Sequence, residues 1–134
     1  MSCLFNSLRR LLENERNFSK TSVRTEICDF METNLSESID GEEIKEWIKI
    51  SNIDEQLASD PKSYIEKMRN PGQWGGGIEI AMASKLYNVI IKIRDSYSND
   101  IIATFDCGPQ KINKKQIVLR YTGTHFEPSF ETPI

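Results

Sequence analysis

The sequence predicts an α+β domain in which the helices are mostly N-terminal and the strands mostly C-terminal. Apolar residues recur at helical spacing through the first half of the chain. A loop rich in glycine and proline follows, and three short β-branched runs come after it. Since 134 residues are enough for one domain with a single core, we expect one domain over residues 1–134.

The first element is an amphipathic helix, predicted over residues 3–14 from apolar side chains that recur on one face. These side chains are Leu4, Phe5, Leu8, Leu11 and Leu12. Cys3 stands at the start of this helix, on the flank of the apolar face. Free main-chain N–H groups and the positive end of the helix dipole favour an anion there, and the thiolate is the reactive form of cysteine. Cys3 is therefore a candidate nucleophile.

Three more helices are expected before the glycine-rich loop. The second helix carries an apolar stripe from Val23 to Met31, and three hydroxyl residues ahead of it are N-cap candidates, namely Ser19, Thr21 and Ser22. The third is shorter, centres on Trp47 and follows the turn at Asp40-Gly41. The fourth begins at Asp60-Pro61 and runs to Met68.

The loop RNPGQWGGG leads into a predicted helix of small and apolar residues, IEIAMASKLYN. Three β-branched runs bounded by turn residues then predict strands. They are VIIKI (89–93), IIATF (101–105) and IVLRY (117–121).

The charge balance argues against a nucleic-acid or anionic-membrane surface. The chain has 17 Lys and Arg residues against 20 Asp and Glu residues, a net charge of −3. The first residues lack a signal peptide, and no stretch reaches the roughly 20 apolar residues of a membrane span. The three cysteines are odd in number and have no C-x-x-C spacing. We therefore expect a reduced, cytoplasmic, monomeric protein that binds neither nucleic acid nor membrane.

The single histidine, His125, follows the last predicted strand and the turn at Thr122-Gly123. An imidazole there is a candidate general base for the thiol of Cys3. Glu127 lies two residues later, so in an extended segment both side chains point to the same face. Its carboxylate is therefore a candidate for orienting the ring of His125 and stabilising the imidazolium.

Other chemistry fits the sequence less well. Gly72–Gly77 has the spacing of a phosphate-binding loop, but Ile78-Glu79 follows where such a loop needs Lys and a hydroxyl residue. The cysteines and His125 lack the paired local spacing of a zinc site, so we expect no metal. Cys28 is predicted to be a partly buried structural thiol and Cys107 an exposed turn residue.

Three segments resemble, in order and at about the same spacing, the ovarian-tumour (OTU) family of papain-like cysteine proteases. SCLFNSL is similar to the family's nucleophile segment, D-G-x-C-L-F-x-x-[IL]. QWGGGIEIAMASKLYNVIIKI is similar to its central W-G-G-x-x-E-[LI] segment, and IVLRYTGTHFEPSF to its closing strand with an H-[YF] pair. The matching residues of the central motif are Trp74, Gly75, Gly76, Glu79 and Ile80. The resemblance spans almost the whole chain.

The resemblance implies a papain-like OTU fold with a small β-sheet packed between helices. It also implies a deubiquitinase that hydrolyses isopeptide or peptide bonds at the C-terminus of ubiquitin or a ubiquitin-like protein. Cys3 would be the nucleophile, His125 the general base and Glu127 the orienting group, with no cofactor. The enzyme would act in the cytoplasm, or in the host cytoplasm if its source is viral or a bacterial effector.

The resemblance also gives roles to residues around this triad. Trp74 would pack near the catalytic histidine, the alternative being an ordinary core aromatic. Gly75, Gly76 and Phe126 would support the site, and the glycines would let main chain approach a partner's extended tail. Glu79 is expected to be structural and to accept from main-chain donors in the first turn of its helix.

The sequence departs from the family pattern at two positions. The Asp-Gly pair before the nucleophile is missing, because the Asp would precede Met1 and Met1 stands at the Gly. This leaves three explanations: an upstream extension, an oxyanion site assembled differently, or a catalytically impaired ubiquitin-binding module. Glu127 stands where the family more often has Asp or Asn, so its longer side chain must fold back to reach the ring.

Overall fold

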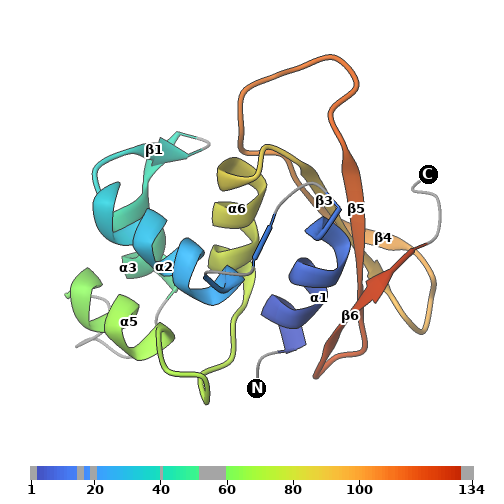
Figure 1. Cartoon of the computed structure of the whole chain (residues 1–134), viewed down its shortest axis with the longest axis horizontal. Helices are drawn as coiled ribbons and strands as arrows, with labels where there is room; N and C mark the ends of the chain where they lie inside the picture. Colours follow the sequence, from blue (N-terminus) through green and yellow to red (C-terminus); the bar gives the residue numbers. More distant parts are fainter. Residues whose placement is uncertain (1–2, 15–16, 19–20, 40, 52–59, 131–134) are drawn as a thin grey trace.

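Helices form the N-terminal part of the fold and a mixed sheet forms the C-terminal part (Figure 1). The computed structural model describes residues 3–14, 17–18, 21–39, 41–51 and 60–130; Met1, Ser19 and Asp40 lie outside them. The helices are α1 (Cys3–Leu12), α2 (Val23–Thr33), α3 (Ile44–Ser51), α5 (Pro61–Met68) and α6 (Gly77–Leu86). The strands are β1 (Ser38–Ile39), β2 (Glu42–Glu43), β3 (Ile90–Asp95), β4 (Ile101–Phe105), β5 (Gln116–Tyr121) and β6 (Phe126–Ser129). The predicted α+β class and the order of its parts are confirmed.

Two helices begin where the sequence predicts because a side chain caps their first N–H groups. Ser22 is the N-cap of α2, and its hydroxyl accepts a hydrogen bond from the Thr25 N–H at 3.1 Å. Asp60 caps α5 by accepting from the Ser63 N–H at 3.4 Å. Pro61 follows in the first turn of α5, where its missing N–H costs no helical hydrogen bond.

The larger sheet has the strand order β4-β3-β5-β6. β3 and β5 are parallel, whereas β3 with β4 and β5 with β6 are antiparallel. α6 packs against β3 and β4, and α1 packs against β5 and β6. The nucleophile candidate at the start of α1 therefore lies on the side of the sheet that ends in β6, the strand that follows His125.

The core lies between the helices and the apolar face of this sheet. α6 is buried along its length from Ile78 to Ser84, because it packs against α2 and α3 as well as against the sheet. The sheet contributes buried side chains from its two central strands, namely Ile91, Ile93, Ile117 and Leu119. Among the helices that the structure describes, none has the length and apolar character needed to cross a membrane.

Three strands were not predicted as strands from the sequence. β6 contains Pro128, which cannot donate to a ladder, but β6 is an edge strand where proline is tolerated. β1 and β2 have two residues each and form an antiparallel pair in which Ser38 lies opposite Glu43. Gly41, at a φ of 89°, lies in the turn between them, a conformation that favours glycine.

Candidate active site

Cys3 is the first residue of α1, and its side chain is half-buried. The helix is fixed in place by the apolar face that the sequence predicts, with Leu4, Phe5 and Leu8 all buried. The thiol therefore lies at a helix start, where the first main-chain N–H groups have no partner within the helix. This is a suitable environment for a nucleophile.

α1 and β6 are joined side by side although they lie at opposite ends of the chain. The Ser7 hydroxyl, one turn after Cys3, donates to the main-chain oxygen of Phe126 at 3.1 Å. Farther along, the Arg10 guanidinium lies 5.4 Å from the centre of the Phe130 ring. The two elements thus advance in the same direction, and Cys3 lies at the end where β6 begins, directly after His125.

A second contact supports the same orientation of α1. The Lys115 ammonium donates to the main-chain oxygen of Leu11 at 3.2 Å, which ties the end of α1 to the start of β5. Since β5 and β6 are antiparallel, the start of β5 lies beside the end of β6. The start of α1 therefore lies toward the opposite end, where His125 precedes β6.

His125 lies in a tight turn whose hydrogen bonds fix its main chain. Its N–H donates to the Thr122 hydroxyl at 3.0 Å, and the Thr122 N–H donates to its carbonyl oxygen at 3.0 Å. Gly123, at a φ of 99°, supplies the left-handed conformation of this turn. The hydrogen bonds that the structure describes for His125 use its main chain, and its side chain is exposed.

Trp74 lies against the His125 ring, with 5.5 Å between the ring centres and 53° between the ring planes. The indole is 44% exposed, so the alternative of an ordinary core aromatic is wrong. An aromatic side chain in contact with the imidazole restricts the rotation of the imidazole ring. The structure therefore brings Trp74 and His125 together.

Glu127 lies in β6 directly opposite Arg120 of β5. Its neighbour Phe126 packs with Tyr121 at 4.8 Å between ring centres, against the core, so Glu127 points to the other face of the sheet. Arg120 also reaches Asn99, with 3.5 Å between its guanidinium and the amide oxygen. Arg120 is therefore the cross-strand neighbour of Glu127 on the same face of the sheet.

The three glycines after Trp74 have different surroundings. A Cβ on Gly75 would lie 2.8 Å from Cζ of Phe5 and 2.9 Å from Cδ2 of Leu4, so the main chain packs directly on α1. A Cβ on Gly76 or Gly77 would have no neighbour within 4 Å. A glycine at position 75 is therefore required for the contact with α1. At Gly76 and Gly77 the space beside the main chain is open.

Glu79 has the structural role that the sequence predicts. Its carboxylate accepts from the Gly76 N–H at 2.8 Å and from the Tyr64 hydroxyl at 2.6 Å. The side chain is almost completely buried, and this burial raises the pKa of Glu79 in spite of the two hydrogen bonds. The same burial and the nearby carboxylate raise the pKa of Tyr64, so its hydroxyl stays a donor.

A cavity of about 390 Å³ opens beside these glycines and Trp74. Its lining includes three further aromatic side chains, Trp47, Tyr64 and Phe105. Trp47 is held by donating from its indole nitrogen to the main-chain oxygen of Ile39 at 2.9 Å. The cavity has the aromatic lining and exposed main chain that suit an extended peptide.

The other cysteines are less suited to chemistry. Cys28 is fully buried rather than partly buried, and burial raises the pKa of its thiol to about 11, which makes it inert. Cys107 is half-buried, so the prediction of an exposed turn residue is wrong. Its N–H donates to the buried Ser84 hydroxyl at 3.1 Å, which pulls the segment onto α6. Within the described residues, no group of three His, Cys, Asp or Glu side chains is placed to hold a metal ion.

Ser7 and Arg24 are two buried polar residues around the site that the sequence analysis missed. For Ser7 a signal was available, since it follows Cys3 by one helical turn and therefore shares its side of α1. Arg24 lies beside the apolar stripe of α2. The residues to which it donates are 44 and 47 positions away in the chain, so no local pattern indicated its role.

The family model described as OTU-like cysteine protease matches residues 2–128 of the chain. A comparison with curated protein sequences gives no match. Solved structures with a similar fold include the OTU domain of OTUD1, with 15% identity and a TM-score of 0.67 over 97% of this chain and 79% of that chain.

Two further similar structures have ubiquitin bound. One is the Hazara virus OTU, with 20% identity and a TM-score of 0.58 over 95% of this chain and 73% of that chain. The other is an OTU deubiquitinase from Wolbachia pipientis wMel, with 18% identity and a TM-score of 0.56 over 95% of this chain and 88% of that chain. At these identities the structural likeness establishes the fold. Together with the family model, which spans nearly all of the sequence, it shows that the chain belongs to the family of OTU-like cysteine proteases.

Proposed function

We propose that this chain is a thiol-dependent deubiquitinase that hydrolyses the bond between the C-terminus of ubiquitin, or of a ubiquitin-like protein, and a lysine amine. The observation that carries the proposal is the junction of α1 and β6. The Ser7–Phe126 hydrogen bond joins segments 119 residues apart, which supports a position of Cys3 close to His125, just before the start of β6. Membership of a cysteine protease family and the ubiquitin-bound structures of similar fold support it.

The reaction follows from the chemistry of these two groups. His125 takes the proton of the Cys3 thiol, and the thiolate attacks the carbonyl carbon to form an S–C bond. N–H groups at the start of α1 stabilise the oxyanion. The imidazolium then gives its proton to the departing lysine amine, which leaves a thioester. Water attacks the thioester with His125 as base, the S–C bond breaks, and the thiol is restored.

Glu127 and Trp74 have supporting roles in this proposal. Glu127 orients the His125 ring and stabilises the imidazolium. To reach the ring, its carboxylate turns away from Arg120, with which it shares a face of the sheet. Trp74 covers one side of the ring. The cavity beside Gly76 and Gly77 receives the extended C-terminal tail of the substrate, because no side chain of these residues blocks the main chain.

The direct test uses ubiquitin whose C-terminal carboxyl is replaced by an electrophile that forms a stable adduct with a thiolate. We expect the wild-type chain to form one adduct, located at Cys3 by mass spectrometry. Cys3→Ala should form none. Cys107→Ala, which removes the other half-buried thiol, is the matched control and should react as the wild type does. An unlabelled wild type, or equal labelling of Cys3→Ala, would reject the proposal.

The second candidate is a ubiquitin-binding module that retains the fold and has lost turnover. The observation that favours it is the register of β6, which places Glu127 opposite Arg120 on the outer face of the sheet. If this cation keeps the carboxylate from the ring of His125, the base lacks its orienting group. Binding of unmodified ubiquitin in calorimetry without any adduct to the electrophilic probe would select this module over the enzyme.

A further inference from the structure

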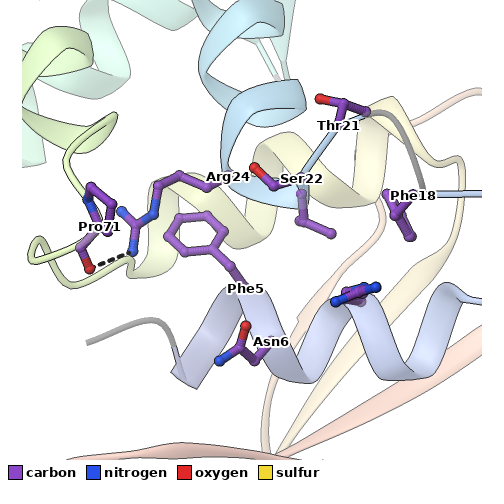
Figure 2. A pocket seen from close by; sticks show the side chains of 9 residues that line it. Phe5, Asn6, Phe18, Thr21, Ser22, Arg24 and Pro71 are labelled. Atoms are coloured by element: carbon purple, nitrogen blue, oxygen red, sulfur yellow. Dashed lines mark hydrogen bonds between the residues drawn. The ribbon is translucent and has the colours of Figure 1, made fainter.

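Arg24, in α2, is a buried cation between α1 and the Trp74 loop, which we define as residues 70–76, from the residue after Arg69, the C-cap of α5, to the N-cap of α6. Only 7% of its surface is exposed. One terminal nitrogen donates to the main-chain oxygen of Met68 at 2.7 Å, and the other donates to the main-chain oxygen of Pro71 at 3.4 Å. Its guanidinium carbon lies 4.2 Å from the centre of the Phe5 ring (Figure 2). Burying an arginine requires such partners, because an unsatisfied buried charge is strongly unfavourable.

The partners of Arg24 lie where α5 ends and the Trp74 loop begins. Met68 ends α5, and Pro71 lies in the turn that follows. Their two carbonyl oxygens are fixed by the planar fork of a guanidinium, which donates in set directions. At the other end of the loop, the Gly76 N–H is fixed by Glu79. Trp74 therefore lies in a segment that is held at both ends, by Arg24 before it and by Glu79 after it.

Phe5 connects this clamp to the start of α1. Its ring contacts the guanidinium of Arg24 and is also the neighbour that a Cβ on Gly75 would strike, at 2.8 Å. Phe5 is two residues after Cys3, and Gly75 directly follows Trp74. The Phe5 ring therefore links Arg24 to α1, which carries the thiol of Cys3, and to the Trp74 loop, which carries the indole.

We propose that Arg24 is a positioning residue for the candidate active site. It holds Pro71 and Phe5 in place, so that Trp74 stays against His125 and the start of α1 stays beside them. The assignment deepens the proposed function and rests on it for its catalytic meaning. The contact between Trp74 and His125 is a physical consequence that can be measured without any turnover.

The surroundings of Arg24 explain why its loss would be felt at a distance. A cavity of about 290 Å³ lies along Phe5, Arg24 and Pro71, and Figure 2 shows the guanidinium bridging between the ring and the proline carbonyl at its wall. Without the guanidinium, the ring and the loop have free space into which to move. Interiors without such space would resist the shift.

The test compares Arg24→Met, which keeps the side chain's length and removes its charge and donors, with Arg69→Met as the matched control. Arg69 also joins α2 to α5, but through surface ion pairs with Asp29 and Glu32 rather than through the Trp74 loop. Both variants are made in a Trp47→Phe background, so that Trp74 is the only indole. A protonated imidazole in contact with an indole quenches its fluorescence, and histidine changes charge between about pH 5 and 8.

At about pH 5, in the Trp47→Phe background and in Arg69→Met, we expect His125→Gln to raise Trp74 fluorescence, because the substitution removes the imidazole that contacts the indole. In Arg24→Met this change should lose at least half of its amplitude. The kcat for a ubiquitin conjugate should fall by up to about 100-fold, as misplacement of reacting groups by about 1 Å does, with KM changed less. Equal fluorescence changes in Arg24→Met and Arg69→Met would overturn the proposal.

Arg24→Lys keeps the test decisive if Arg24→Met does not fold. Lysine retains the charge and reaches one carbonyl, but it lacks the planar fork and the flat face that lies on Phe5. We expect this variant to fold and still to lose part of the fluorescence change. Full retention would show that the charge alone matters and would overturn the positioning role. If no variant and no wild-type chain hydrolyses a conjugate, the proposed function fails, and the fluorescence result still decides the inference about Arg24.

Discussion

Arg24 and Glu79 place two opposite charges in the interior of this small fold, one at each end of the loop that carries Trp74. Neither is needed for core packing, since an apolar residue would fill the same volume at lower desolvation cost. Both use their charge to fix main-chain groups, carbonyl oxygens for Arg24 and an N–H for Glu79. At the scale of single residues, charge is therefore used to set the path of a loop.

Glu79→Gln gives a prediction for the pH dependence of stability. Because burial raises the pKa of Glu79 in the folded chain, the folded state holds this proton more tightly than the unfolded state does. The contribution of Glu79 to the free energy of unfolding therefore falls as the pH rises above the ordinary carboxyl value of about 4.5. The glutamine variant lacks this loss, so its stability relative to the wild type should increase from about pH 4 to about pH 7.

Urea unfolding followed by circular dichroism at several pH values measures this difference. Glu42→Gln, at an exposed carboxylate in β2, is the control and should keep a nearly constant difference from the wild type. A difference for Glu79→Gln that stays constant, or that moves in favour of the wild type as the pH rises, would contradict the prediction.

Elements with local signals could be predicted from the sequence, and elements defined by distant partners could not. The starts of α2 and α5 follow from Ser22 and Asp60, which cap N–H groups three residues later. β6 depends on pairing with β5 and contains a proline, so no local pattern identified it. The role of Arg24 could not be predicted for the same reason, because it donates hydrogen bonds to carbonyl oxygens far along the chain.

The junction of α1 and β6 is the element contact on which the site depends, and Ser7→Ala tests it. Removing the hydroxyl leaves the Phe126 carbonyl without this donor, which should cost about 1 kcal/mol of stability. If the bond also sets the distance between Cys3 and His125, kcat for a ubiquitin conjugate should fall about tenfold with little change in KM. Steady-state kinetics and urea unfolding measure the two effects.

Ser84→Ala is the matched control for this variant. Its hydroxyl is buried, donates to the Ala81 carbonyl at 2.8 Å and accepts from the Cys107 N–H, away from the junction of α1 and β6. A similar loss of stability without a loss of kcat is expected. If Ser7→Ala keeps the wild-type kcat, the hydrogen bond contributes to stability alone.

At the scale of the whole molecule, the candidate site exists only in the complete fold. Cys3, Trp74 and His125 come from the beginning, the middle and the end of the chain, and each is held by an element packed on another. The family pattern predicted these three positions, because its motifs are read from short segments. The supports could not be predicted in this way, since Ser7 bonds to Phe126 and Phe5 packs on Arg24 only through tertiary structure.

This arrangement predicts that reactivity and global folding are lost together. If Cys3 depends on α1 packing against both β6 and the Trp74 loop, its labelling by the electrophilic ubiquitin probe should decline with the fraction of folded chain in urea. The labelling rate and the circular dichroism signal should then share one midpoint, as expected of a small two-state domain. A labelling rate that disappears while the dichroism is still native would show that the site opens by local unfolding, with α1 or the loop detaching first.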